Sequence, residues 1–179
     1  MCIRDRSGSF NKWMSDHFVT YIKNGFKLDK TSIDDVFANH LNVVAKVNRE
    51  RGVVGGHNIN AFKDPSNLYP MGRVHIVSET PSNVNGVSVI EYRLHALDAQ
   101  GNISPNLLSK TYNPKTVFDP NVWSPAQMKE LGYKGFMKAI DNGTFNPSGR
   151  TFNGSVDGVT VRGHYLEGAE RIIATWWLE

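Results

Sequence analysis

The chain has 179 residues, 40% of them hydrophobic and 11% aromatic, a composition that excludes intrinsic disorder and suits one compact domain. No apolar run reaches the roughly 20 residues that span a bilayer, so we expect a soluble domain with no membrane partner. Twenty Lys and Arg against seventeen Asp and Glu give a net charge of +3, which fits an anionic partner such as RNA. Because the cations are scattered along the chain, charge alone does not assign that partner.

The sequence offers little for a disulfide or a metal. Cys2 is the only cysteine, and no histidines or carboxylates show ligand spacing such as His-x-x-x-His, so we expect neither a metal nor another cofactor. The first residues, MCIRDR, resemble translated adapter sequence, and we interpret residues 1–8 as a non-native or disordered leader. Residues 9–179 are then one domain cut from a longer protein, and export must be directed from outside this chain.

Three helices are expected. Apolar residues at helical spacing predict a first helix over 10–22. A second should start at Thr31-Ser32, continue through Val47 and end at Gly52. A third should be capped by Ser124 and end near residue 141, because Pro125 and Gln127 complete a capping box and Asn142-Gly143 stops the helix.

The remaining apolar segments have strand character. Alternating apolar residues predict that Ile90, Tyr92 and Leu94 share one face of a strand. The last two strands should form a hairpin around Gly168. The expected strands cover residues 74–78, 86–97, 115–118, 159–166 and 171–177. Helices followed by strands indicate an α+β fold, with a helical part at 9–52 and a catalytic sheet part at 53–179.

Gly55-Gly56-His57-Asn58 is the first candidate for chemistry. Two glycines allow a tight turn and leave room beside an imidazole, which titrates near neutrality and suits a general base. The turn predicts a surface loop, on which replacing His57 should cost about 1 kcal/mol or less. The alternative is an ordinary loop histidine without a catalytic role.

Two other positions could join His57 in metal-free RNA cleavage. His75 could protonate the leaving oxygen, or it could be a surface strand residue. Lys115 could stabilise charge on the phosphorus oxygens, or it could be an ordinary solvated lysine.

The C-terminal strand carries candidates for substrate binding. Thr175 and Trp177 should project to one face, where the hydroxyl could bind a phosphate or base edge and the indole could stack on a base. For Trp176, packing within the sheet is the better interpretation.

The order of short motifs resembles that of the bacterial EndoU-type ribonucleases, toxin domains at the C-termini of contact-dependent inhibition and other polymorphic toxins. The resemblance spans roughly residues 52–179. The matching pieces are Gly55-Gly56-His57, His75, Lys115-Thr116-Val117-Phe118, Trp123-Ser124, Gly158-Val159-Thr160-Val161 and Ile173-Ala174-Thr175.

The resemblance implies a barnase/EndoU/colicin/RelE-like fold, with N-terminal helices packed on a twisted antiparallel sheet. It implies a metal-independent endoribonuclease toxin that cleaves RNA, with tRNA a candidate substrate, and leaves a 2′,3′-cyclic phosphate. It also implies a monomer that is secreted or delivered from the cell surface, acts in the target-cell cytoplasm and is inhibited by a cognate acidic immunity protein.

The family's catalytic residues correspond to His57, His75, Lys115 and Thr175. His164 is an alternative general acid and a substrate-binding candidate, with Asn58, Thr116 and Trp177. The family usually has Tyr where this chain has Trp177, which retains only the stacking role. Two other functions remain open: a nuclease using His57 with Glu79, and a non-enzymatic C-terminal binding module of a secreted or surface protein.

Overall fold

The computed structural model describes residues 21–23, 26–28, 30–64, 73–166 and 171–179. The chain forms two compact units, which are described separately: residues up to Phe37 together with Trp123–Glu179, and residues Ala38–Val122. Among the helices described, none has the length and apolar character needed to cross a membrane.

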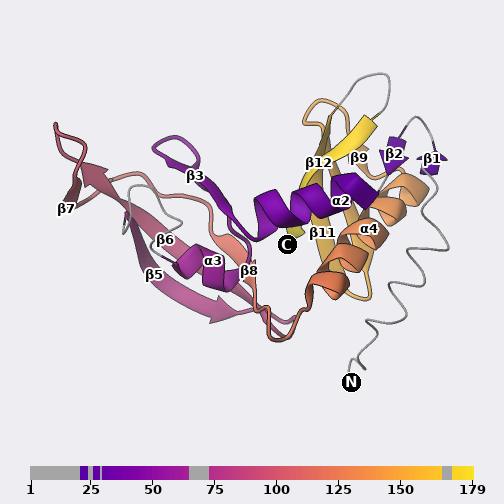
Figure 1. Cartoon of the computed structure of the whole chain (residues 1–179), viewed down its shortest axis with the longest axis horizontal. Helices are drawn as coiled ribbons and strands as arrows, with labels where there is room; N and C mark the ends of the chain where they lie inside the picture. The colour runs from indigo at the N-terminus through magenta and orange to yellow at the C-terminus, as the bar shows by residue number, and fades with distance from the viewer. Residues whose placement is uncertain (1–20, 24–25, 29, 65–72, 167–170) are drawn as a thin grey trace. The chain divides into compact units, whose positions relative to one another are not determined.

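The first unit is built on a six-stranded sheet (Figure 1). All neighbouring strands are antiparallel except β2 and β12, which are parallel. The strands, in spatial order, are β1 (Tyr21–Lys23), β2 (Phe26–Leu28), β12 (Arg171–Leu178), β11 (Val159–Leu166), β10 (Thr151–Val156) and β9 (Phe145–Asn146). The pairing of β11 with β12 confirms the predicted terminal hairpin, although the turn around Gly168 lies outside the described residues.

Helix α4 (Pro125–Asn142) packs on this sheet and confirms the third predicted helix. Ser124 and Gln127 form the capping box, and Gly143 ends the helix in a left-handed conformation with φ of 65°. The helix approaches the sheet so closely that a Cβ atom at Gly132 would collide with the Trp176 ring. Trp176 is fully buried, as sheet packing predicted.

The two helices predicted near the N-terminus are wrong in part. Residues 10–20 lie outside the described residues, but Tyr21 and Ile22 belong to β1. The second helix consists of α2 (Lys30–Val36) and a π-helical turn, η1 (Phe37–Leu41), and does not continue through Val47. The following segment pairs with another strand, whose hydrogen bonds replace those of a longer helix.

The second unit has a hairpin, a short helix and a four-stranded sheet. The hairpin pairs β3 (Val44–Asn48) with β4 (Gly52–Gly55), and α3 (Ile59–Lys63) follows. In the sheet, the long central β6 (Val87–Leu97) pairs with β5 (Val74–Pro81) along one side. On its other side it pairs with β8 (Lys115–Phe118) near its start and β7 (Ile103–Leu107) near its end.

The core of this unit lies on one face of β6. Ile90, Tyr92 and Leu94 are buried, which confirms the alternation predicted from the sequence. They pack in a cluster with Val44, Val53, Phe62, Tyr112 and Val117. Both units therefore combine a few helices with mainly antiparallel sheets, and the predicted α+β class is confirmed.

Candidate active site

The loop before His57 requires glycine at two successive positions. Gly55 and Gly56 have φ of +76° and +67°, values that residues with a Cβ atom rarely adopt. A Cβ at Gly56 would also collide with the Val44 side chain. Because Gly56 N donates to the carbonyls of His40 and Val43, each at 2.8 Å, the turn is fixed against the end of η1. The expectation that these glycines form a tight turn is confirmed.

His57 is buried rather than exposed on a surface loop. Only 7% of the residue is accessible to solvent, so the expectation of a surface position is wrong. The reason is that the loop is bonded into the unit: Phe118 N donates to the His57 carbonyl, and Asn58 N donates to the Leu41 carbonyl, both at 2.8 Å. The imidazole therefore occupies a rigid, largely desolvated position.

One hydrogen bond defines which nitrogen of His57 carries the proton. Nδ1 lies 2.8 Å from the carbonyl oxygen of Thr116. A carbonyl only accepts, so Nδ1 must donate, and the neutral ring then has its lone pair on Nε2. In this tautomer Nε2 is the ring nitrogen that can accept a proton.

The surroundings of His57 keep it neutral. Burial lowers its pKa well below the ordinary 6.5, and the charges of Lys115 and His40 lower it further, while the Thr116 carbonyl opposes them. The His40 ring, at the end of η1, has its centroid 5.2 Å from that of His57. At neutral pH the imidazole of His57 is therefore in its neutral form.

Lys115 begins β8 and is also buried, with 9% of the residue exposed. Its Nζ donates a long hydrogen bond of 3.4 Å to the Val53 carbonyl. Burial lowers the pKa of its ammonium from 10.5 to about 7. A lysine in this state exchanges a proton near neutral pH and presents a poorly hydrated positive charge.

Asn58 and Thr116 support the loop around His57. The Asn58 side chain accepts from Asn60 N at 2.9 Å, which caps α3, and its amide donates to Asn42 at 3.1 Å. Thr116 contributes the carbonyl that orients His57.

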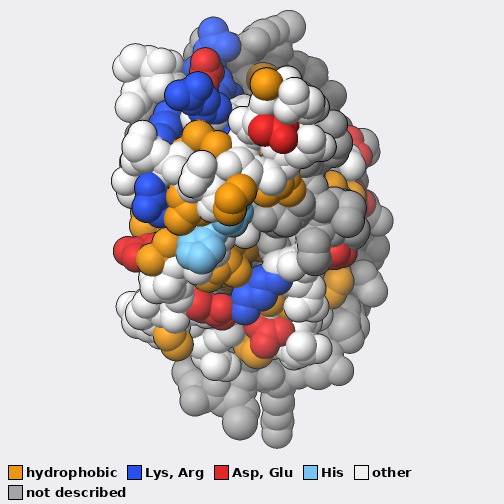
Figure 2. All heavy atoms as spheres, turned by 90° about the vertical axis from the view of Figure 1, so that its left-hand side faces the viewer, with side chains coloured by type: hydrophobic (Ala, Val, Ile, Leu, Met, Phe, Trp, Pro, Cys, Tyr) orange, Lys and Arg blue, Asp and Glu red, His pale blue; other side chains and the backbone are white. Residues whose placement is uncertain are grey.

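His75 lies apart from this group. It pairs with Arg93 of β6, whereas Lys115 pairs with Ile90. Residues 90 and 93 point to opposite faces of the strand, so His75 and Lys115 project from opposite faces of the sheet. His75 is exposed, and its ring packs edge-on against His95 at 5.8 Å between centroids. Figure 2 shows histidine side chains lying among hydrophobic ones on the face that it presents.

The first unit contains a second group of candidates. Nδ1 of His164 lies 3.2 Å from the Thr175 hydroxyl, and its ring centroid is 5.3 Å from that of Trp177. Thr175 and Trp177 therefore both contact His164, which confirms that they share a face. The structure thus brings the candidates together as two groups, one in each unit, with His75 in neither.

His40 was missed by the sequence interpretation. It falls in a segment whose apolar spacing predicted a continuous helix, and no motif marks it. The π-helical turn that ends at Leu41 would have pointed to His40, because such turns are frequent at functional sites. This turn could not be recognised from the sequence. Glu79, proposed as a partner of His57 in another type of nuclease, instead pairs with Lys63 at 2.6 Å.

Neither group resembles a metal centre. Within the described ranges, no three or more His, Cys, Asp or Glu side chains are arranged to hold a metal ion. What the group around His57 offers is a neutral base, a cation of lowered pKa and fixed backbone dipoles, which together suit proton transfer near a developing negative charge.

Comparison with known proteins identifies two relatives. No family model matches the chain. The chain is 31% identical over 123 residues, 69% of its length, to the tRNA nuclease CdiA of Yersinia mollaretii. It is 28% identical over 144 residues, 77% of its length, to the tRNA nuclease CdiA of a strain of Escherichia coli. The chain spans only 4% of the length of each relative, and is thus similar to a small part of two proteins named as tRNA nucleases.

Proposed function

We propose that this chain is a nuclease toxin that cleaves tRNA by the EndoU type of reaction, without a metal ion. The observation that carries the proposal is the buried group of His57 and Lys115, in which the base is held neutral and in the required tautomer. The similarity to two tRNA nucleases supports the substrate class.

In the proposed reaction, Nε2 of His57 takes the proton from a ribose 2′-hydroxyl. The 2′-oxygen attacks the adjacent phosphorus, and the bond from phosphorus to the 5′-oxygen of the next nucleotide breaks. The leaving 5′-oxygen receives a proton, and the products are a 2′,3′-cyclic phosphate and a 5′-hydroxyl. The Lys115 ammonium stabilises the charge that builds on the phosphorus oxygens.

The remaining roles belong to residues outside this pair. His75, with His164 as the alternative, is the proposed donor of the proton to the leaving oxygen. Thr175 is proposed to hydrogen-bond a phosphate of the RNA, and Trp177 to stack on a base. Asn58 and Thr116 are proposed to contact the substrate beside His57.

The biological setting is also a proposal. The chain corresponds to a small part of its long relatives, which fits a C-terminal toxin domain that a larger protein delivers to the cytoplasm of a target cell. It is proposed to act as a monomer of barnase/EndoU/colicin/RelE-like fold. An acidic immunity protein is proposed to block it by covering His57 and Lys115.

The test is incubation of the purified protein with total tRNA in EDTA, followed by mapping of the ends produced. We expect cleavage at full rate, with cyclic phosphate on one fragment and hydroxyl on the other. Cleavage that returns only with added Mg²⁺ or Zn²⁺ would contradict the acid–base mechanism. RNA that stays intact with or without metal would favour a binding module instead.

A further inference from the structure

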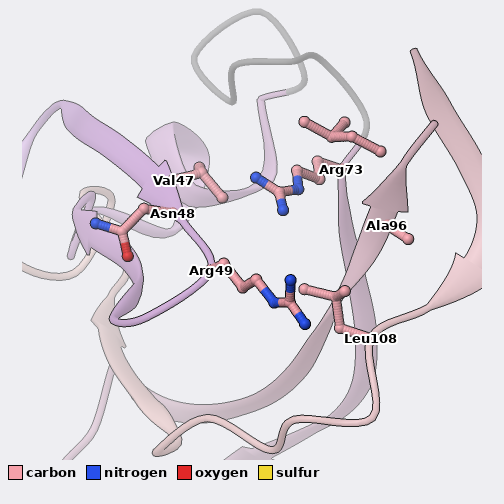
Figure 3. A pocket seen from close by; sticks show the side chains of 7 residues that line it. Val47, Asn48, Arg49, Arg73, Ala96 and Leu108 are labelled. Carbon is pink, nitrogen blue, oxygen red and sulfur yellow. The ribbon is translucent and has the colours of Figure 1, made fainter. Parts of the chain in front are cut away.

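The second unit contains a pocket that none of the proposed catalytic residues lines. It is an open pocket with a volume of about 620 Å³, within the usual range for small-molecule sites. Figure 3 shows the guanidinium groups of Arg49 and Arg73 extending toward its middle from opposite sides. The other lining residues that the structure describes are uncharged, and most are apolar: Val47, Asn48, Ala96, Leu97 and Leu108.

Arg49 stands on a turn that is held firmly. The Asn48 side chain accepts from the backbone N–H groups of Glu50 and Arg51, at 3.1 and 2.6 Å. The Tyr112 hydroxyl donates to the Arg49 carbonyl at 3.0 Å, and its ring stacks on buried Tyr92. The backbone of Arg49 is thereby tied to the core, while its side chain reaches into the pocket.

Arg73 is buried, with 7% of the residue exposed. Its Nε donates to the His95 carbonyl at 3.0 Å, which orients the guanidinium. Among the residues that the structure describes, no carboxylate pairs with Arg73 or Arg49, and none lines the pocket. Two guanidinium groups without a neighbouring carboxylate suit an anion. The apolar side chains beside them leave room for an aromatic ring.

We propose that this pocket, the Arg49–Arg73 pocket, binds one nucleotide of the RNA substrate, with its phosphate on the two arginines and its base against Val47 and Leu108. Guanidinium groups bind phosphate oxygens through paired N–H donors, and bases pack on guanidinium planes and apolar side chains. This inference rests on the proposed cleavage of RNA and adds a binding subsite to it.

The features of the pocket favour a nucleotide over an acidic protein segment. An acidic side chain would need the arginines but not the apolar wall beside them, whereas a nucleotide uses both. Lys and Arg side chains also gather toward one end of the face that Figure 2 presents. Such a surface attracts a polyanion regardless of its sequence.

Direct binding is measured on a Lys115→Met protein, which should cleave RNA about 10² to 10³ more slowly than the parent. Nucleoside 5′-monophosphate, inorganic phosphate, unphosphorylated nucleoside and an acidic peptide are titrated while the Nε–Hε signals of the arginines are followed by NMR. We expect the nucleotide to shift the Arg49 and Arg73 signals at lower concentration than phosphate or nucleoside. An acidic peptide that shifts them while the nucleotide does not would overturn the proposal.

The kinetics of tRNA cleavage are measured for Arg49→Ala in the active protein. Arg51→Ala is the matched control, because Arg51 lies on the same turn but does not line the pocket. We expect Arg49→Ala to raise KM for tRNA about tenfold with kcat unchanged, and to reduce the slope of log affinity against log salt by about one. Arg51→Ala should change KM less than about twofold. Equal effects of the two variants would overturn the subsite.

The subsite and the proposed function fail in different ways. If the Lys115→Met protein and the parent both bind nucleotide through Arg49 but the parent leaves RNA intact, the subsite is supported and the cleavage mechanism is wrong. If the parent cleaves tRNA and Arg49→Ala behaves like Arg51→Ala, only the subsite is wrong.

Discussion

His57 and His164 both direct Nδ1 at an oxygen atom, yet their surroundings give the two rings different chemistry. His57 is buried and bonds to a backbone carbonyl, which only accepts and so selects one tautomer. His164 is exposed and lies near the Thr175 hydroxyl, which both donates and accepts and so selects neither. The contact in the second unit therefore fixes the tautomer of its imidazole, whereas the contact of His164 with Thr175 in the first unit does not.

The two groups also differ in what they cost the stability of the fold. Lys115 loses hydration on burial without a carboxylate partner among the described residues, and the depressed pKa expresses that cost. The group around His164 stands at the surface and carries no such penalty. We infer that the second unit retains an unfavourable arrangement for its chemistry, as active sites often do.

The largest effect should follow Lys115→Met. Removing the cation should reduce the cleavage rate by about 10² to 10³, in the range measured for lost transition-state donors. The same change should raise the melting temperature at pH 7, because the apolar side chain suits the buried position better. Cleavage rate and thermal midpoint are measured on one sample. Lower stability together with lower activity would contradict the account, since it would mark Lys115 as a structural residue.

The pH dependence should sharpen the contrast between the units. His57, with its lowered pKa, is neutral at pH 6.5 and above, and the charge of Lys115 is lost as pH rises through about 7. Cleavage of saturating tRNA should therefore decline above pH 7, about tenfold per unit while the charge is required. In Lys115→Arg the decline should move to much higher pH, because arginine stays protonated.

Stability should follow the same ionisation with a defined sign. Between pH 10.5 and about 7, Lys115 is protonated in the unfolded chain but not in the folded chain. Lys115 therefore lowers the free energy of unfolding by a growing amount as the pH falls through this range. The advantage of Lys115→Met over the parent should grow across that range and level off below it. Urea unfolding at several pH values measures this, and a difference independent of pH would contradict burial as the cause.

Smaller effects are expected from the group in the first unit. Trp177→Leu should raise KM for tRNA about fivefold to tenfold if one base stacks on the indole, and Trp177→Phe should retain most of the affinity. Neither change should shift the pH profile, because the indole does not titrate. Identical kinetics for both variants and the parent would remove the stacking role.

Local signals in the sequence predicted much of the fold. The Ser124–Gln127 capping box defined the start of α4, and the alternation through Ile90 defined β6, because both depend on nearby residues. The prediction of a helix through Val47 was wrong because pairing of β3 with β4, set by tertiary structure, outweighed helical spacing.

The sequence predicted which residues could form the candidate site, but it did not predict how they are arranged. Gly55-Gly56-His57 and Lys115 could be selected from motif order, and the tight turn followed from the glycines. The burial of His57 and its contact with His40 depend on how η1 meets the loop, which no local pattern encodes. The separation of His75 from Lys115 follows from strand register across β6, also absent from local sequence.

The central claim, that His57 is the general base, is tested most directly by His57→Ala. Because the imidazole is buried, this change should lower stability by about 1 to 3 kcal/mol, so cleavage is measured well below the variant's melting temperature. We expect a folded protein whose cleavage of tRNA in EDTA is about 10² to 10⁴ slower and is partly restored by added imidazole. His95→Ala, which removes a histidine from outside the group, should leave the rate near that of the parent. A folded His57→Ala protein that cleaves tRNA at the parent rate would contradict the account.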